Sequence, residues 1–311
     1  MTDYIISVRH VRRGNFIAEP GRTRFLATPA TRVPVPDHAI SQSSWLKAVM
    51  SEGRIGKHTE SGEDCGDITV FVHGYNTSPG NVAKRHRKFR KSLAAHGYKG
   101  AVVSFDWPSD DRAINYLEDR SDAKITALRL VDDCISLLAA THRRGCQYNL
   151  HVVAHSMGSY VVREAFDDAD DRPAIAASNW NVSQMCLVAA DVSSASMSAS
   201  DSRSRSLYRH CTRLTNYYNP YDSALKLSDI KRAGVAARAG RRGLPLDRPD
   251  KSVDVNCGPS FKASRQEGSG HSWYFDSPEF MRDLAETLSG DVDGRVTAKR
   301  HRNEDGDLLL A

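Results

Sequence analysis

One short stretch, residues 149–161, constrains the fold of this chain more than any other feature. It opens with an apolar run at 150–153 and then reaches Ser156, which lies between two small residues, Ala154 and Gly158. A helix-like segment follows. A strand, a sharp turn and a helix in this order can lift a nucleophilic serine above the edge of a sheet. The strained backbone of such a turn needs small residues on both sides of the serine. The usual pattern has glycine at both positions, and alanine at the first is a mild departure.

A serine between small residues also closes ordinary strand-to-helix junctions that carry no activity. The motif therefore indicates a nucleophile only if the chain supplies the other parts of a serine-based site. These parts are N–H donors for an oxyanion, a histidine that accepts the serine proton, and a carboxylate that orients the histidine. The rest of the chain contains candidates for each of them.

Apolar strands alternate with helical segments along most of the chain. Two early apolar runs, 68–72 and 100–105, are typical of buried strands, and each precedes a segment with helical spacing. This alternation predicts an α/β fold with a mostly parallel central sheet and helices on both faces. Helices are expected at 81–96, at 121–143 and between Ser277 and Gly290, and further strands at 185–190, 213–218 and 252–255.

Polar and aromatic residues follow several of the predicted strands. His73, Trp107, Asp191 and Asp222 stand directly after such strands, and Ser156 follows its own. In open α/β sheets, ligands bind at the carboxyl ends of the strands. One rim of the sheet is therefore expected to collect these residues.

The patterns divide the 311 residues into three parts. Residues 1–66 carry strand-like runs and a short helical segment, and we expect them to add antiparallel strands to an edge of the sheet. Residues 67–290 form the catalytic domain. Within it, the long connection 225–251 is either a cap over the site or a long loop, and its basic segment 238–242 is expected to be exposed. Residues 291–311 are polar and irregular, and we expect a flexible tail.

Three histidines follow the serine and are candidates for the base. His301 lies in the polar tail among basic residues, and His210 precedes a strand, at the wrong end for the rim. His271 lies in a glycine-rich loop between the last predicted strand and the last helix. Such a loop can bring an imidazole over the rim, so His271 is the expected base.

Two aspartates are candidates for the acid. Asp222 follows the second strand after the nucleophile strand, and Asp191 follows the strand between them. We favour Asp222, because the first of these positions is the usual one in this architecture. Asp191 is kept as the alternative acid, and the aspartate that does not serve as the acid is expected to cap or anchor its loop.

The oxyanion donors are expected on both sides of the serine. One is the amide of Met157, directly after the nucleophile, and the other is the amide of Tyr75, in the loop after strand 68–72. Gly74 allows the backbone of that loop to approach closely. The residues expected to contact the substrate are His73, Gly74, Asn76, Trp107, His155 and Trp273.

Composition limits the partners and compartments. A net charge of +5 is modest for this length and gives little reason to expect a nucleic-acid partner. No apolar run approaches the roughly 18 residues of a membrane span, and the N-terminus lacks the form of a signal peptide, so we expect a cytoplasmic protein. Export without a signal would leave no trace here.

No metal site is expected. The six cysteines form no C-x-x-C pair, which argues against zinc and against a disulfide framework. His151 and His155 are four residues apart, but they flank a strand and a turn. A serine-based mechanism needs no cofactor.

Seven motifs together resemble the α/β-hydrolase superfamily, and more narrowly a bacterial family of uncharacterised, esterase- or lipase-like α/β hydrolases. The resemblance implies the α/β-hydrolase fold, nucleophile Ser156, base His271 and an acid in the N-x-x-D-x-A-L segment, hence Asp222. It does not imply a substrate. The motifs are F-V-H-G-Y-N-T (71–77), F-D-W-P-S (105–109), Y-L-E-D-R (116–120), A-H-S-M-G (154–158), A-A-D-V (189–192), N-P-Y-D-S-A-L (219–225) and G-H-S-W-Y-F-D-S-P (270–278).

The expected function is a serine hydrolase that cleaves a carboxylic ester through an acyl-enzyme intermediate, with a small-molecule or lipid ester as substrate. One alternative is a lipase or phospholipase, although residues 225–251 are polar and basic for a lipid-binding cap. Another is a non-catalytic binding protein with the same fold. Contact with a membrane surface through the basic segment 84–91 has no further support, because such segments are more often solvated helix faces.

Overall fold

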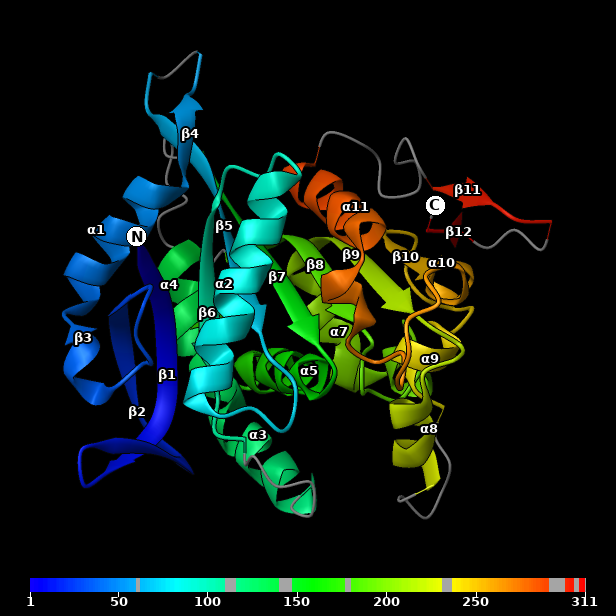
Figure 1. Cartoon of the computed structure of the whole chain (residues 1–311), viewed down its shortest axis with the longest axis horizontal. Helices are drawn as coiled ribbons and strands as arrows, with labels where there is room; N and C mark the ends of the chain where they lie inside the picture. The colour runs from blue at the N-terminus through cyan, green and yellow to red at the C-terminus, as the bar shows by residue number, and fades with distance from the viewer. Residues whose placement is uncertain are drawn as a thin grey trace.

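The computed structural model describes residues 1–59, 62–109, 116–139, 147–176, 180–230, 237–290, 300–304 and 308–310. One sheet crosses the molecule from end to end (Figure 1). In the described part of the chain its strands follow the order β11-β12-β10-β9-β8-β7-β5-β6-β1-β2-β3, and β4 extends β5 outside this path. The central strands are β5 (Asp64–Val72), β6 (Ala101–Asp106), β7 (Gln147–His155), β8 (Val182–Val188), β9 (Cys211–Tyr218) and β10 (Ser252–Asn256).

All neighbouring pairs among these six central strands are parallel, which confirms the predicted α/β fold with a mostly parallel sheet. Residues 68–72 of β5 are buried on both faces of the sheet. The sequences of such strands are continuous apolar runs, which is why these strands could be predicted from the sequence.

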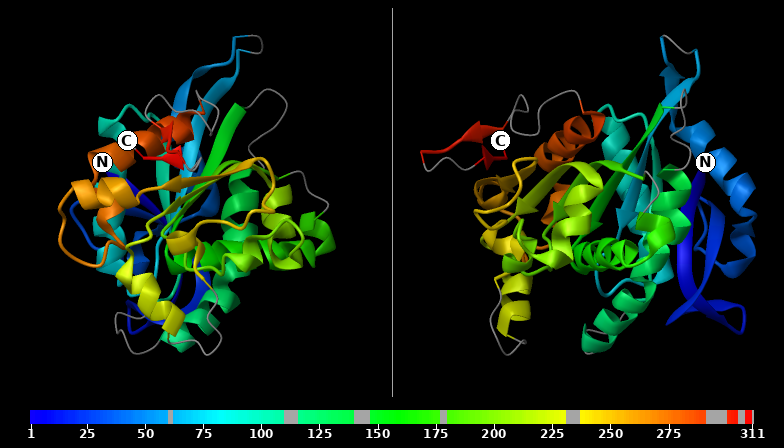
Figure 2. Two further views of the ribbon diagram at one scale, coloured as in Figure 1. Left: turned by 90° about the vertical axis from the view of Figure 1, so that its right-hand side faces the viewer. Right: turned by 180° about the vertical axis from the view of Figure 1, so that it is seen from behind.

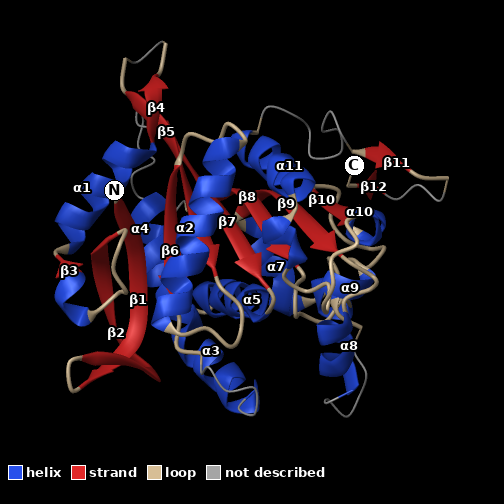
Figure 3. Ribbon diagram, in the orientation of Figure 1, coloured by secondary structure: helices blue, strands red, loops and turns tan. Residues whose placement is uncertain are grey.

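Helices cover both faces of the sheet, as predicted (Figure 3). Side chains of β5 alternate between two apolar clusters, since Val70 and Val72 join one and Phe71 joins the other. The Phe71 face is covered by α2 (Pro79–Ala95) and α11 (Pro278–Ser289), which lie side by side in front of the sheet in Figure 1. The opposite face, seen from behind in Figure 2, is covered by α1 (Gln42–Gly53), α3 (Tyr116–Leu130), α4 (Ser136–Ala139), α5 (Met157–Asp170) and α7 (Ser202–Arg209).

Two predicted helices show how local signals set element boundaries. The last helix begins after Ser277, whose hydroxyl accepts a hydrogen bond from the amide of Phe280, and it ends at Gly290 in the left-handed conformation. The helix expected at 121–143 runs from 116 to 139 and contains a π-helical turn, Val131–Ile135. Residues 140–143 lie outside the described part of the chain.

The N-terminal residues form one edge of the sheet. Strands β1 (Thr2–Arg12) and β2 (Asn15–Pro29) make an antiparallel hairpin, and the short β3 (Ala39–Ile40) pairs with β2. Antiparallel strands were expected at this edge, but β1 itself runs parallel to β6. The short β4 (Arg54–Lys57) is antiparallel to β5.

The basic face of α2 is partly used to hold this edge. Arg87 and Arg90 both reach the fully buried carboxylate of Asp3 on β1, with N–O distances of 2.5 and 3.1 Å. The interpretation of 84–91 as a solvated basic face is therefore corrected for these two arginines.

No helix in the described residues is long and apolar enough to cross a membrane.

The described parts of the C-terminal segment contact α11 and β10, and the flexible tail expected at 291–311 stays a prediction. Arg300 is buried and donates to both carboxylate oxygens of Asp283 on α11, at 2.6 and 2.7 Å. Strand β12 (Leu308–Leu309) pairs with β10, and β11 (His301–Arg302) pairs with β12. A buried ion pair and the pairing of β12 with β10 hold these residues in place. Residues 291–299 and 305–307 lie outside the described part.

Candidate active site

A sharp turn between β7 and α5 carries Ser156. β7 ends at His155 and α5 begins at Met157, so Ser156 is the single residue between them, with φ +56° and ψ −125°. A non-glycine residue with positive φ is strained, and such strain is typical of functional turns. The small residue after the turn has a steric reason, because a Cβ on Gly158 would lie 2.5 Å from the carbonyl oxygen of Val72.

Ser156, His271 and Asp222 form a continuous hydrogen-bonded relay. His271 Nε2 lies 2.8 Å from Ser156 Oγ, and its Nδ1 lies 2.6 Å from Asp222 Oδ2. The Asp222 carboxylate is fully buried, so it accepts the Nδ1 proton and leaves the lone pair of Nε2 facing the serine hydroxyl. The structure thus brings together the three residues that the sequence suggested as nucleophile, base and acid.

Each member of the relay is fixed from a different element. Asp222 follows β9 and also accepts a hydrogen bond from the amide of Leu225, at 2.9 Å, at the start of α8 (Ser223–Ile230). The loop of His271 is tied to the same strand end, because Asn219 Nδ2 donates to the carbonyl of Gly270 at 3.1 Å. Gly270 has φ +71°, which favours glycine, and a Cβ there would lie 2.8 Å from Asn219 Nδ2.

His155 holds the main chain of His271. Its Nε2 lies 3.0 Å from the carbonyl oxygen of His271, so this nitrogen donates, and the two imidazole rings are 5.0 Å apart. Burial, and then the neighbouring imidazole of His271, hold the pKa of His155 well below its ordinary value, so the ring is neutral. His155 also borders a small cavity next to the His271 loop, so the substrate contact expected for it stays a prediction.

Asp191 has a different partner. Its carboxylate lies 3.2 Å from Nε of Arg238, both side chains are buried, and its amide donates to the carbonyl of Ser156 at 3.1 Å. Asp191 therefore anchors the serine turn, and the geometry favours Asp222 as the acid.

The ion pair between Asp191 and Arg238 corrects the expectation of an exposed basic loop at 238–242 for its first residues, whereas Arg242 is exposed. Arg238 is buried, and α9 (Ala239–Arg242) lies against the strand ends, with Gly240 hydrogen-bonded to both Ala190 and Asn219. Within the connection 225–251, residues 231–236 lie outside the described part of the chain.

The loop after β5 approaches the serine closely. A Cβ on Gly74 would lie 2.8 Å from the Cβ of Ser156, so only glycine allows this approach. Tyr75 follows and is half-buried, and Asn76 is exposed with φ +55°. Met157 is the first residue of α5, where backbone amides have no partner within the helix. The two amides expected to bind the oxyanion therefore lie on segments that border Ser156.

A buried network supports this loop from the N-terminal strand. Arg9 on β1 bonds to Asp106 Oδ1 at 2.7 Å, and its other nitrogens donate to the carbonyls of Thr77 and Ser109 at 2.6 and 3.1 Å. Burial alone would raise the pKa of Asp106, but Arg9 and His73 together hold it below its ordinary value. The carboxylate is therefore ionised and pairs with Arg9.

His73 and Trp107 belong to this buried network and do not face an open surface. Their rings stack at 5.4 Å, Trp107 Nε1 donates to the carbonyl of His73 at 2.8 Å, and their exposed fractions are 1% and 0%. His73 Nδ1 lies 2.7 Å from the carbonyl of Gly74, so it donates to it. Direct substrate contact by these two side chains is corrected to support of the loop.

Trp273 is also buried. It lies in a short 3-10 helix, η4 (Trp273–Asp276), and its ring contacts Phe261 and Tyr274 at centroid distances of 5.5 and 5.1 Å. Only 5% of its surface is exposed, so the expected substrate contact is corrected to a role in fixing the segment after His271. The sequence predicted that Trp273 lies near the site, but it did not predict the direction of the side chain.

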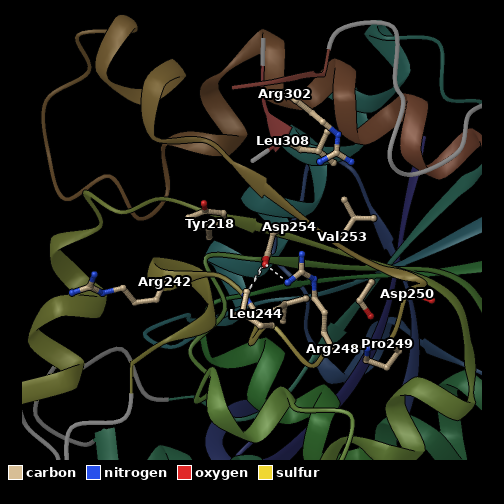
Figure 4. A pocket seen from close by; sticks show the side chains of 12 residues that line it. Tyr218, Arg242, Leu244, Arg248, Pro249, Asp250, Val253, Asp254, Arg302 and Leu308 are labelled. Atoms are coloured by element: carbon tan, nitrogen blue, oxygen red, sulfur yellow. Dashed lines mark hydrogen bonds and ion pairs between the residues drawn. The ribbon is translucent and has the colours of Figure 1, made fainter. Parts of the chain in front are cut away.

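Two cavities lie near the carboxyl rim. A small one, about 110 Å³, is bordered by His155 and Ser272, the sequence neighbours of Ser156 and His271. A larger one, about 470 Å³, lies at the β10 edge, where Arg248 and the amide of Leu244 contact Asp254 (Figure 4). None of the residues that line the larger cavity belongs to the Ser156 relay.

No group of three or more His, Cys, Asp or Glu side chains in the described residues could hold a metal ion. His151 Nε2 instead lies 3.4 Å from Asp67 Oδ1. Five cysteines lie in the described part of the chain and are unpaired thiols: Cys65, Cys134, Cys186, Cys211 and Cys257.

A family model matches residues 49–255, two-thirds of the chain, and is described as an alpha/beta hydrolase of unknown function (DUF900). The chain belongs to this family of α/β hydrolases. The α/β-hydrolase fold that the motifs implied is thereby confirmed, together with the observed sheet. The match contains Ser156 and Asp222 and ends before His271, so His271 lies outside the matched region.

One relative is an uncharacterized protein, alr1448, from Nostoc sp. strain PCC 7120. It is 22% identical over an alignment of 232 residues, and the match covers 61% of this chain and 59% of the relative. The chain thus spans about three-fifths of that protein.

Several solved structures resemble the fold at low identity. Esterase B of Lactobacillus rhamnosis, with a tributyrin phosphonate inhibitor, is 12% identical, with a TM-score of 0.39 over 80% of this chain and 91% of that one. A Trichoderma reesei cutinase is 13% identical, with a TM-score of 0.33 over 79% and 86%. Carboxylesterase CesB of Bacillus subtilis is 11% identical, with a TM-score of 0.36 over 76% and 87%. At this distance they carry no argument about substrate, and membership of the family rests on its model.

Proposed function

We propose that this α/β hydrolase is a serine hydrolase that cleaves a carboxylic ester through an acyl-enzyme intermediate. The observation that carries the proposal is the relay in which His271 bonds to Ser156 Oγ at 2.8 Å and to Asp222 Oδ2 at 2.6 Å. A serine hydroxyl is a weak nucleophile at neutral pH, and a base within hydrogen-bond reach is what activates it. A merely structural serine has no need of a histidine held by a buried carboxylate.

Acylation begins when Ser156 Oγ attacks the carbonyl carbon of the ester and its proton passes to His271 Nε2. The carbonyl oxygen becomes an oxyanion, for which the amides of Met157 and Tyr75 are the donors. Asp222 offsets the positive charge that forms on His271. The bond to the alcohol oxygen then breaks, His271 gives its proton to the departing alcohol, and the acyl group stays on Ser156.

Deacylation repeats the sequence with water. His271 takes a proton from water, the hydroxide attacks the acyl carbon, and the same two amides bind the second oxyanion. The bond to Ser156 Oγ breaks and His271 returns the proton to the serine. The products are a carboxylic acid and the free enzyme, and no cofactor takes part in any step.

Turnover of para-nitrophenyl butyrate tests the proposal. We expect Ser156→Ala to lose on the order of 10⁴-fold or more in kcat, because removal of one member of such a relay usually costs this much. Ser204→Ala is the matched control, since Ser204 is a buried serine in α7 whose hydroxyl donates to the carbonyl of Ser196. Activity of the folded Ser156→Ala protein close to wild type would refute the proposal.

The lipid-ester alternative is tested with the same variants. Phospholipid vesicles replace the soluble ester, and release of fatty acid is followed. A lipase needs an apolar entrance, whereas Arg241 and Arg242 lie on α9, next to the strand ends. We therefore expect the short soluble ester to be the better substrate; preferential cleavage of the vesicles would favour the alternative.

A further inference from the structure

The small cavity beside the catalytic base lies between α2, η4 and the ends of the central strands. Its border includes His155 and Ser272, which are the direct sequence neighbours of Ser156 and His271. Phe71 and Phe275 supply apolar walls, and their rings meet edge to face at 5.6 Å. Two basic residues of α2, Arg85 and Lys88, also line the cavity.

Arg85 differs from the neighbouring basic residues of its helix. Arg87 and Arg90 pair with Asp3, and Lys88 pairs with Asp276. Arg85 forms an ion pair with no carboxylate of the described residues, and it donates one hydrogen bond, to Thr77 Oγ1 at 2.7 Å. A guanidinium has five N–H donors, so this one bond leaves most of them available to a ligand in the cavity that Arg85 lines.

Burial makes this arrangement costly. Arg85 is largely withdrawn from solvent, and burial lowers the pKa of its guanidinium, which means that its charge is destabilised where it lies. A desolvated cation normally gains an anionic partner that offsets the cost. The chain supplies none in its described part, so the partner is expected to come from a ligand.

The charges around the cavity favour an anion. Arg85 and Lys88 contribute two positive charges, Asp276 contributes one negative charge, and the buried His155 is neutral, which leaves one positive charge. A volume of about 110 Å³ equals roughly four water molecules at about 30 Å³ each. A carboxylate fits this space, whereas a long acyl chain does not.

We propose that the substrate is a small ester that carries a carboxylate, and that Arg85 binds this carboxylate in the cavity beside His271. The inference rests on the proposed ester hydrolysis and names the class of ester. Arg85 is then a specificity-determining residue: it pairs with the ligand through a charge-assisted hydrogen bond and takes no part in the proton transfers.

Two matched pairs of esters test the proposal, one for each side of the scissile bond. Mono-para-nitrophenyl adipate is compared with para-nitrophenyl hexanoate, and para-acetoxybenzoate with para-tolyl acetate. The readout is selectivity, the kcat/KM of the carboxylate ester divided by that of its neutral match. Because both members share the site, a general disturbance of the loop through Thr77 cancels in this ratio.

In at least one pair, Arg85→Gln should lower the selectivity by about tenfold or more. Tenfold corresponds to the lower end of the free energy that a hydrogen bond to a charged group contributes. Arg85→Lys should keep part of it, because the positive charge remains. Lys91→Gln removes a charge from an exposed position of the same helix and should leave the ratio unchanged. Equal selectivity in wild type and Arg85→Gln for both pairs would overturn the proposal while ester hydrolysis itself stands.

A binding measurement covers the case in which no ester is turned over. Ser156→Ala protein, with and without Arg85→Gln, is titrated calorimetrically with each carboxylate ester and its neutral match. Tighter binding of a carboxylate ester that depends on Arg85 supports the anion site even if the proposed hydrolysis fails. Equal affinities in the two proteins would contradict it.

Discussion

The guanidinium of Arg9 lies 2.7 Å from the carboxylate of Asp106, with both side chains 1% exposed. This pair joins the first strand of the chain to the loop that borders the nucleophile, because Arg9 also donates to the carbonyl of Thr77. The N-terminal hairpin is therefore coupled to the candidate oxyanion loop through a buried cation, each of whose three nitrogens donates a hydrogen bond.

Arg9→Met should lower both stability and turnover. Breaking a buried pair leaves the Asp106 carboxylate without its cation, which costs about 3–5 kcal/mol in the free energy of unfolding. Since the loop also loses a support, we expect kcat on a short ester to fall by about tenfold to a hundredfold with little change in KM. Urea unfolding and steady-state kinetics measure the two effects separately.

Arg300→Met is the matched control for Arg9→Met. Arg300 forms an equally buried pair with Asp283 on α11, but it touches neither the loop nor the relay. It should lose stability to a similar extent and keep the kcat of the folded enzyme. An equal fall of kcat in both variants would show that the Arg9 effect reflects general destabilisation.

Gly74→Ala should impair turnover through one added methyl group. The new Cβ would lie 2.8 Å from the Cβ of Ser156 and 3.1 Å from the carbonyl of His155, so the loop must move away from the serine. Displacing one oxyanion donor is expected to cost on the order of 100-fold in kcat. In Gly80→Ala, a control in the first turn of α2, the nearest atom outside the helix is 3.9 Å away, and wild-type kinetics are expected.

Stability should fall in mild acid because of His86. Burial, and then Arg90 and Arg87, lower the pKa of this fully buried histidine from 6.5 to about 3. The unfolded chain takes up the proton below about pH 6.5 and the folded chain does not, so the contribution of neutral His86 is complete above that pH. It declines by about 1.4 kcal/mol per pH unit as the pH falls toward 3.

Urea unfolding at pH 7 and pH 5 checks this dependence. His86→Gln should reduce the slope of the unfolding free energy against pH by about one proton. His10→Gln, at an exposed position, should retain the wild-type slope. An unchanged slope in His86→Gln would mean that other groups govern the acid sensitivity.

The sequence predicted the relay because its members stand at fixed places relative to strong local signals. Buried parallel strands are continuous apolar runs, and a residue directly after such a strand lies at the carboxyl rim. Ser156 and Asp222 were found in this way, and the glycines around His271 marked a loop that can reach the serine.

Side-chain direction and distant contacts could not be predicted in this way. His73 and Trp107 stand at strand ends as expected, but packing turns their rings inward to support loops. Arg9 and Asp106 are 97 residues apart, and no local pattern marks an ion pair between strands. The contact between Arg300 and Asp283 was missed for the same reason. A polar segment is predicted to be exposed to solvent unless the residue that it pairs with is known.

Labelling with a fluorophosphonate tests the central claim, an activated Ser156, most directly. Intact mass and peptide mapping are measured for wild type, Ser156→Ala and His271→Ala, with folding checked by circular dichroism. We predict one phosphonyl adduct on Ser156 in wild type and none in the two variants, because the reagent needs a serine that a base has activated. A folded wild type that stays unlabelled, or a His271→Ala protein labelled at the wild-type rate, would contradict the account.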